Sequence, residues 1–252
     1  MIPGLAAARA HRVGLVAIGT NYLAQALLAI GNAREAIERL TEVTAAERVG
    51  ERGDAWHANN LALLGFARVA YEDEQSALDL LSVAWAETKR SWLANLVPIV
   101  GNLYAESLIR MSARSPELLD QANQILSTCA EEVELSRMLR SKIKTLSLRS
   151  EYWWLQGDPS ESRQASSDAI RLLKDKNWQM PALRAEDVLI QHAKILARVG
   201  NVREAREYAL RARREKQKKL KTLPVQYANH WDTELVNREI ERVCGDLGLD
   251  GS

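Results

Sequence analysis

The sequence is poor in the residues that build strands, disulfide-linked folds and tight turns. Its 252 residues include two cysteines, one phenylalanine, 13 glycines and 6 prolines. Short β-branched and aromatic runs bounded by turn residues, which mark strands, are nearly absent. Alanine, leucine, arginine and glutamate dominate instead, and these are strong helix formers. The composition therefore predicts an all-α protein.

The chain also lacks the features that direct a protein to a membrane or out of the cell. No run of about 18 apolar residues is present, so no membrane-spanning helix is expected. The first residues, MIPGLAAARAHRVGLVAIG, have no basic region ahead of their apolar part and do not resemble a signal peptide. Cys129 and Cys244 lie far apart within helical patterns, which favours two reduced core thiols. A cytoplasmic protein is expected, and its net charge of +1 gives no overall attraction to nucleic acid.

Sequence patterns of catalytic and metal sites are missing as well. The four histidines are scattered, and none has a spacing that suits zinc. There is no GxSxG elbow around a serine, no GxxxxGK[ST] phosphate loop, and no carboxylate pair isolated among apolar residues. We therefore expect no enzyme activity, no cofactor and no metal.

The chain does contain alanines that recur at a nearly constant interval. They are Ala36, Ala77, Ala122, Ala165 and Ala205. Their period of roughly 40 to 45 positions indicates a helical repeat in which stacked helix pairs bury one another's apolar faces. A single domain of five such units is predicted over residues 3–51, 54–89, 91–134, 136–175 and 180–221, with a capping helix at 226–247.

Two matching strings mark the turns inside the first and last units. GNAREA covers residues 31–36 and GNVREA covers residues 200–205. Glycine tolerates the left-handed conformation that ends a helix, so each string predicts a helix, a turn and a second helix. In the capping helix a water-facing outer surface is expected, as terminal repeats need. This surface would consist of Glu234, Asn237, Arg238, Glu241 and Arg242.

The units resemble tetratricopeptide repeats (TPRs). Leu64-Gly65 is followed twelve residues later by Ala77, and Ala24 with Ala36 and Ala193 with Ala205 have the same offset. The unit length near 40 is more similar to repeats in large bacterial signalling ATPases and maltose-regulon-type transcription activators, where the array is a sensor or effector-binding arm. The resemblance implies a right-handed superhelical solenoid of about five antiparallel helix pairs plus the capping helix.

The resemblance also implies that the first helix of each unit lines a groove that binds a partner. Positions carried over in this way give a mixed polar set, which suits an extended peptide or a partner helix. The candidates are Asn21, Gln25, Asn59, Phe66, Asn102, Glu106, Arg110, Glu151, Trp154, Lys194 and Arg198, with Ala62, Ser147 and Asp187 beside them. The alternative is a solvated inner face that has no dedicated ligand.

These observations favour a non-enzymatic scaffold that binds a protein or peptide, in bacterial signalling or regulation. One alternative is a small-ligand sensor arm of a signalling ATPase or transcription regulator. A second is nucleic-acid binding through residues 203–221, which hold nine basic and three acidic side chains. A solvated outer helix with Glu207–Arg211 and Glu215–Lys219 pairs explains that segment more simply. Because the first helix lacks a polar cap, a neighbouring domain or a second copy of the chain could pack there.

Overall fold

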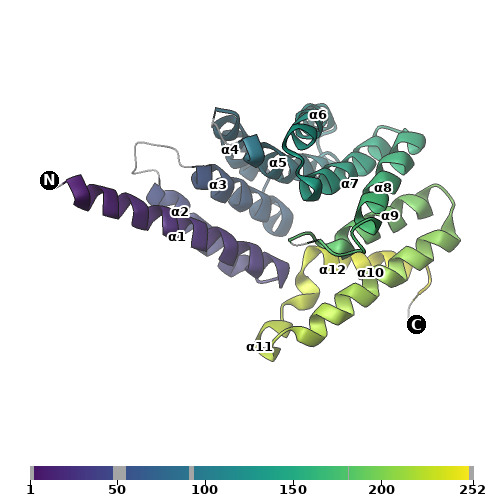
Figure 1. Ribbon diagram of the computed structural model, residues 1–252. Helices are drawn as coiled ribbons and strands as arrows, with labels where there is room; N and C mark the ends of the chain where they lie inside the picture. Colours follow the sequence, from purple (N-terminus) through teal and green to yellow (C-terminus); the bar gives the residue numbers. More distant parts are fainter. Residues whose placement is uncertain (1–2, 48–54, 91–93, 181, 250–252) are drawn as a thin grey trace.

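The computed structural model describes residues 3–47, 55–90, 94–180 and 182–249, and within these ranges the chain is helical and contains no strand. Long helices follow one another through short turns (Figure 1). They are α1 (Pro3–Ala29), α2 (Ala33–Glu47), α3 (Ala55–Ala67), α4 (Leu78–Arg90), α5 (Val97–Met111), α6 (Leu118–Ser136), α7 (Leu139–Leu155), α8 (Pro159–Lys174), α9 (Ala185–Arg198), α10 (Val202–Thr222), α11 (Val225–Ala228) and α12 (Leu235–Asp246). Single turns of π-helix (Arg68–Glu72) and 3-10 helix (Gln75–Ala77, Ala94–Leu96 and Trp231–Thr233) separate some of them. The predicted all-α repeat fold is confirmed.

The helices form two layers of a solenoid. The first helices of the pairs, α1, α3, α5, α7 and α9, pack side by side in chain order, and α12 continues this row by packing on α9. The second helices, α2, α4, α6, α8 and α10, pack against their own partner, and all but α10 also contact the first helix of the next pair. Each pair therefore buries its apolar faces on its neighbours, as stacked repeats do.

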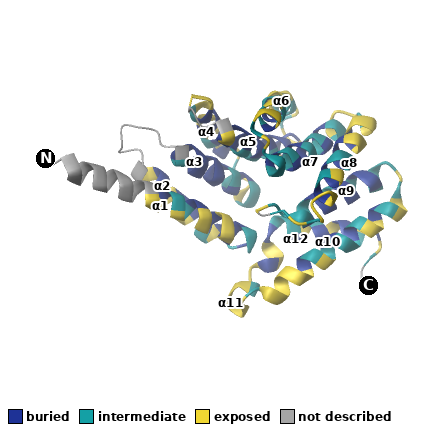
Figure 2. Cartoon of the chain, in the orientation of Figure 1, coloured by how far each residue is buried: buried dark blue, intermediate teal, exposed yellow. Residues whose placement is uncertain are grey.

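The recurring alanines lie where the layers meet. All five are at most 8% exposed, and three are fully buried. A methyl side chain lets two helix backbones approach closely, so these positions can repeat even where the surrounding sequence has diverged. Figure 2 shows the buried residues concentrated between the two layers.

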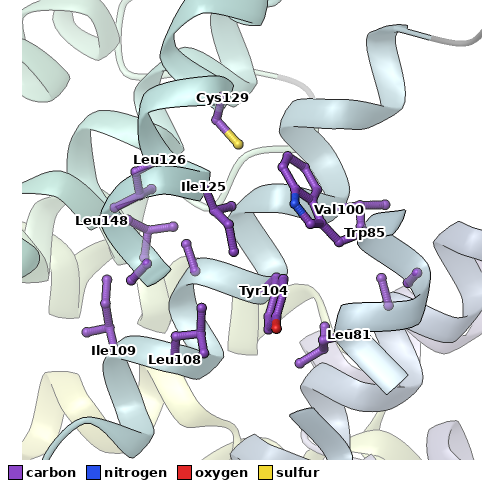
Figure 3. Close-up of a cluster of buried hydrophobic side chains, with 14 of the residues drawn as sticks. Leu81, Trp85, Val100, Tyr104, Leu108, Ile109, Ile125, Leu126, Cys129 and Leu148 are labelled. Atoms are coloured by element: carbon purple, nitrogen blue, oxygen red, sulfur yellow. The ribbon is translucent and has the colours of Figure 1, made fainter. Parts of the chain in front are cut away.

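The central core joins α4, α5 and α6 (Figure 3). Trp85, Tyr104 and Leu126 pack there with the thiol of Cys129. Burial, with a smaller contribution from Glu132, raises the pKa of Cys129 to about 12. The thiol therefore stays neutral and behaves as a core hydrophobe. Cys244 is also buried, and neither cysteine forms a disulfide.

The C-terminal segment differs from the prediction. The single helix expected at 226–247 is divided into α11, a 3-10 turn and α12. Glu234 and Asn237 are 3% and 0% exposed, so their predicted place on a water-facing surface is wrong, whereas Arg238, Glu241 and Arg242 are exposed. The reason is that both side chains form hydrogen bonds at the N-terminus of α12, where a side-chain acceptor caps the helix. The Glu234 carboxylate accepts a 2.8 Å hydrogen bond from the backbone N–H of Asn237, and the Asn237 amide donates to the Trp231 carbonyl at 2.8 Å.

The same segment returns to the first helix pair. The Thr233 hydroxyl donates to the carbonyl of Gly31 at 3.2 Å, across 202 residues of sequence. Gly31 has φ +85°, and a Cβ added there would overlap the carbonyl oxygen of His230. We call this meeting of Gly31 with His230 and Thr233 the closing contact. The solenoid thus turns far enough for its last segment to touch its first turn.

The basic helix α10 forms different ion pairs from the expected ones. The predicted Glu215–Lys219 pair is absent, because Lys219 binds Glu186 at 2.6 Å and Glu215 binds Lys218 at 2.7 Å. Across the described ranges, neither α10 nor any other helix is both long and apolar enough to span a membrane.

Candidate functional site

A cleft of about 790 Å³ lies along the inner row of helices. Its walls come from α5, α7, α9 and α12, and the turn after α5 borders it. The apolar part of the lining includes Ile109, Leu119, Leu148, Leu155, Ile190, Leu235 and Val236. The charged part consists of Arg110, Lys144, Lys194, Arg238 and Arg242 with Glu106, Glu151, Asp187 and Glu239. We call this feature the inner cleft.

One ion-pair network joins the α5, α7 and α9 walls. The Lys144 ammonium lies 3.0 Å from a Glu106 oxygen and 2.8 Å from an Asp187 oxygen, and Arg110 lies 3.0 Å from Glu106. Burial alone would raise the pKa of Glu106, but Lys144 and Arg110 outweigh it and lower the pKa to about 2. Burial likewise opposes the charge of Lys144, and its two carboxylate partners raise its pKa overall. The three helices are therefore tied together by charges that persist at neutral pH.

A second network joins α7, α9 and α12. The Glu151 carboxylate accepts hydrogen bonds from Gln191 at 2.7 Å and Arg198 at 2.8 Å, and Lys194 lies 3.3 Å away. Lys194 also binds Glu239 at 3.2 Å. Burial would raise the pKa of Glu151, but Lys194 and Arg198 lower it overall. These contacts hold α12 in place as a wall of the inner cleft.

Four of the residues predicted for the groove line the inner cleft, namely Glu106, Arg110, Glu151 and Lys194. Two more adjoin it: Arg198 binds Glu151, and its guanidinium lies 5.2 Å from the centre of the Trp154 ring. This distance is within cation–π range. Ser147 and Asp187 line the inner cleft too. The partner-binding role of all these residues remains a prediction.

Other predicted residues lie away from the inner cleft and are mostly buried between helices, although Gln25 is exposed. Asn21 is fully buried and donates to Asn60 at 2.8 Å, while Gln25 donates to Asn21 at 2.6 Å. Asn102 is buried and donates to the Ser141 carbonyl at 3.2 Å.

Asn59 is also buried, Phe66 packs partly buried against the core clusters, and Ala62 is fully buried. The reason is geometric. The first helix of a pair packs on the first helices of the neighbouring pairs and on the second helix of its own pair. Only a narrow stripe of its surface is therefore left to line the groove.

Lys144 and the contribution of α12 were not predicted from the sequence. Lys144, Ser147 and Glu151 follow i, i+3, i+7 spacing on one helix face, so the two predicted residues could have identified Lys144. No such signal exists for Val236 or Arg238. Their place in the inner cleft depends on the path of the chain between α10 and α12.

Among the described residues, no three His, Cys, Asp or Glu side chains gather as a metal ion would need. His192 is buried and bonds the Ser166 hydroxyl at 3.0 Å. Burial, with Arg163, lowers the pKa of His192 to about 4. Because burial disfavours the charged form, this ring stays neutral at physiological pH.

Solved structures with the same architecture identify the fold. A thermophilic TPR protein of Thermus thermophilus superposes with a TM-score of 0.61 over 85% of this chain and 98% of its own, at 16% identity. The fold is that of tetratricopeptide repeats. Two structures of the nearly identical TPR-like repeats of a kinesin light chain candidate from Podosopora anserina give TM-scores of 0.55 and 0.53, at 16% and 15% identity. They cover 81% and 80% of this chain and 95% of their own chains. No family model and no curated protein matches the sequence.

The ion pairs of this TPR-like fold predict that its free energy of unfolding depends on pH. The pKa of Glu106 is lower in the folded chain than its ordinary value of 4.5, so its pairing stabilises the fold above that value. This stabilisation is lost as the pH falls from about 4.5 toward about 2. The Glu106→Gln protein should therefore lose less stability than the parent over this window, measured by urea unfolding at each pH. Glu131→Gln, at an exposed residue of α6, serves as the control and should follow the parent. Parallel curves for Glu106→Gln and the parent would contradict the assignment.

Proposed function

We propose that the protein is a non-enzymatic scaffold that holds an extended segment of a partner protein in the inner cleft. The observation that carries this proposal is the lining of the inner cleft, where apolar side chains lie among charges most of which are held by ion pairs. A fixed polar lining lowers the entropy lost on binding, because fewer side chains have to be ordered. The TPR-like fold and the unit length also lead us to infer a role in bacterial signalling or regulation, in the cytoplasm.

The charges of the inner cleft suggest which partner it suits. Five cationic side chains face four carboxylates. The side chains of Arg110 and Arg238 are both exposed; Arg110 pairs with Glu106, and within the described chain Arg238 has no ion-pair partner. A segment that combines apolar side chains with at least one acidic residue would bury the first and pair the second with these arginines.

A displayed library of random peptides tests the proposal. Peptides enriched on the parent protein should bind it with an affinity that falls at least about tenfold in Arg110→Ala and in Arg238→Ala, which corresponds to about 1.4 kcal/mol for each lost pairing. Arg203→Ala, at an exposed arginine of α10 outside the inner cleft, should bind like the parent. Fluorescence anisotropy gives the affinities, and thermal unfolding confirms that each variant is folded. Failure to enrich any peptide, or equal binding by all variants, would reject the proposal.

A small effector is the second candidate, because the inner cleft of about 790 Å³ falls within the range of small-molecule sites. A thermal-shift screen of sugars, nucleotides and peptides separates the two, since a ligand at 100 times its Kd adds about 2.7 kcal/mol of stability. The basic segment 203–221 supports no comparable proposal, because several of its cationic side chains are already engaged. Lys216 binds Asp232 and Glu241, Lys219 binds Glu186, and Arg211 lies 3.5 Å above the Trp178 ring.

A further inference from the structure

Helix α1 has a largely exposed apolar face, at whose edge the Tyr22 ring lies 6.0 Å from the Trp56 ring of α3. Leu15, Val16, Tyr22 and Leu23 are 60%, 55%, 62% and 46% exposed, which is unusual for side chains of this size. Leu15, Val16 and Leu23 point away from the face of α1 that packs on α2 and α3, where residues such as Ala17, Ala24 and Leu28 are buried. Figure 2 shows the exposed stretch along this helix at one end of the solenoid. We call Leu15, Val16, Gly19, Tyr22, Leu23 and Ala26 the outer face of α1.

The outer face has a symmetric arrangement about Gly19. Leu15 and Leu23 lie four residues before and after it, and Val16 and Tyr22 lie three residues before and after it. Steps of three and four residues return to the same side of a helix, so these side chains form one stripe with glycine at its centre. A Cβ at Gly19 would have no atom within 4 Å, so the centre of the stripe is open.

The charge pattern matches a second copy of the same surface. Residues 13–33 contain no Asp, Glu, Lys or Arg. Two such faces can therefore meet without repulsion between like charges, whereas a charged partner would find no group to pair with. Because an isologous two-fold contact places residue i on residue j and residue j on residue i, a stripe that is symmetric about one point is complementary to itself.

From this placement we propose that two copies of the chain associate through the outer face, with their α1 helices crossing antiparallel at Gly19. Leu15 of each copy then packs on the partner's Leu23, and Val16 packs on the partner's Tyr22. Glycine at the crossing lets the two backbones approach closely, so that the flanking side chains meet. The contact leaves the inner cleft free, since that cleft is built from α5, α7, α9 and α12.

Cysteine cross-linking tests this geometry. In Gly19→Cys the two introduced thiols face each other across the two-fold axis, within reach of a disulfide. They should oxidise to a covalent dimer of twice the 28.2 kDa chain mass. Ala26→Cys is the matched control, because its thiol lies on the same face but seven residues from the axis. The antiparallel crossing places the two Ala26 positions about 20 Å apart at a rise of about 1.5 Å per residue, so this variant should stay monomeric on a non-reducing gel. The native cysteines are both buried and do not compete.

Sedimentation equilibrium provides the second measurement, on the parent chain and on Leu15→Lys/Leu23→Lys. The parent should approach the dimer mass between about 1 and about 200 µM, whereas the double variant should remain a monomer with an unchanged far-UV spectrum. A parent that stays monomeric throughout this range would overturn the proposal and assign the outer face to a different partner. Cross-linking of Ala26→Cys as fast as Gly19→Cys would overturn the antiparallel arrangement.

Discussion

Replacing Arg184 with methionine is expected to lower the free energy of unfolding by about 3–5 kcal/mol, the range found when one partner of a buried ion pair is removed. Arg184 precedes α9 and holds two carboxylates at once. Its Nε lies 3.0 Å from Glu186, and its Nη1 lies 2.5 Å from Glu234. The side chains of these acids are 0% and 4% exposed, so without Arg184 water cannot solvate them. Glu186 would keep Lys219, but Glu234 would keep only the hydrogen bond that caps α12.

Urea unfolding followed by circular dichroism measures this loss. Glu234→Gln added to Arg184→Met removes the buried charge that has lost its partner and should recover part of the stability. Arg90 is an exposed arginine of α4 and provides the control. Arg90→Met should change the stability by no more than about 0.5 kcal/mol. A loss of stability in Arg184→Met as small as that in Arg90→Met would show that the ion pairs of Arg184 do not stabilise the fold.

Gly31→Ala is expected to destabilise the chain by about 1–3 kcal/mol more than Gly200→Ala. The two glycines have nearly the same backbone conformation, with φ +85° and +84°. Alanine therefore meets the same backbone strain at each position. Their surroundings differ. A Cβ at Gly200 has no atom within 4 Å, whereas a Cβ at Gly31 overlaps the carbonyl of His230 and forces the closing contact apart.

Urea unfolding gives the difference in stability, and hydrogen exchange shows where it arises. In Gly31→Ala, exchange should rise in residues 229–234, around the buried Trp231, because local opening sets the exchange rate. Gly200→Ala should leave this segment unchanged. Equal stability losses and identical exchange in the two variants would mean that the closing contact adds nothing to the fold.

This pair of glycines also shows how far the sequence could predict the structure. GNAREA and GNVREA predict the same helix–turn–helix unit, and the structure contains one at each place, because helix ends depend on local residues. The strings cannot predict that Gly31 touches His230, because that contact results from the summed rotation of all the intervening helix pairs.

The residues of the candidate site likewise fall into those that the sequence could predict and those that it could not. The resemblance to tetratricopeptide repeats predicted Glu106, Arg110, Glu151 and Lys194 for the groove, and all four line the inner cleft. Asn102 lies one helical turn before Glu106 but is buried against α7, because a step of four residues moves a side chain about 6 Å along the helix and turns it by about 40°. The contribution of α12 could not be predicted, because it depends on how the chain returns after α10.

Hydrogen exchange of the complex tests most directly whether the inner cleft binds a polypeptide. The parent protein, saturated with a peptide selected from the random library, should show slower exchange in α5, α7, α9 and α12, while α2 and α8 on the opposite layer exchange as before. Slower exchange confined to α1, to α10 or to the outer layer, with exchange in the inner cleft unchanged, would contradict binding of the peptide in the inner cleft.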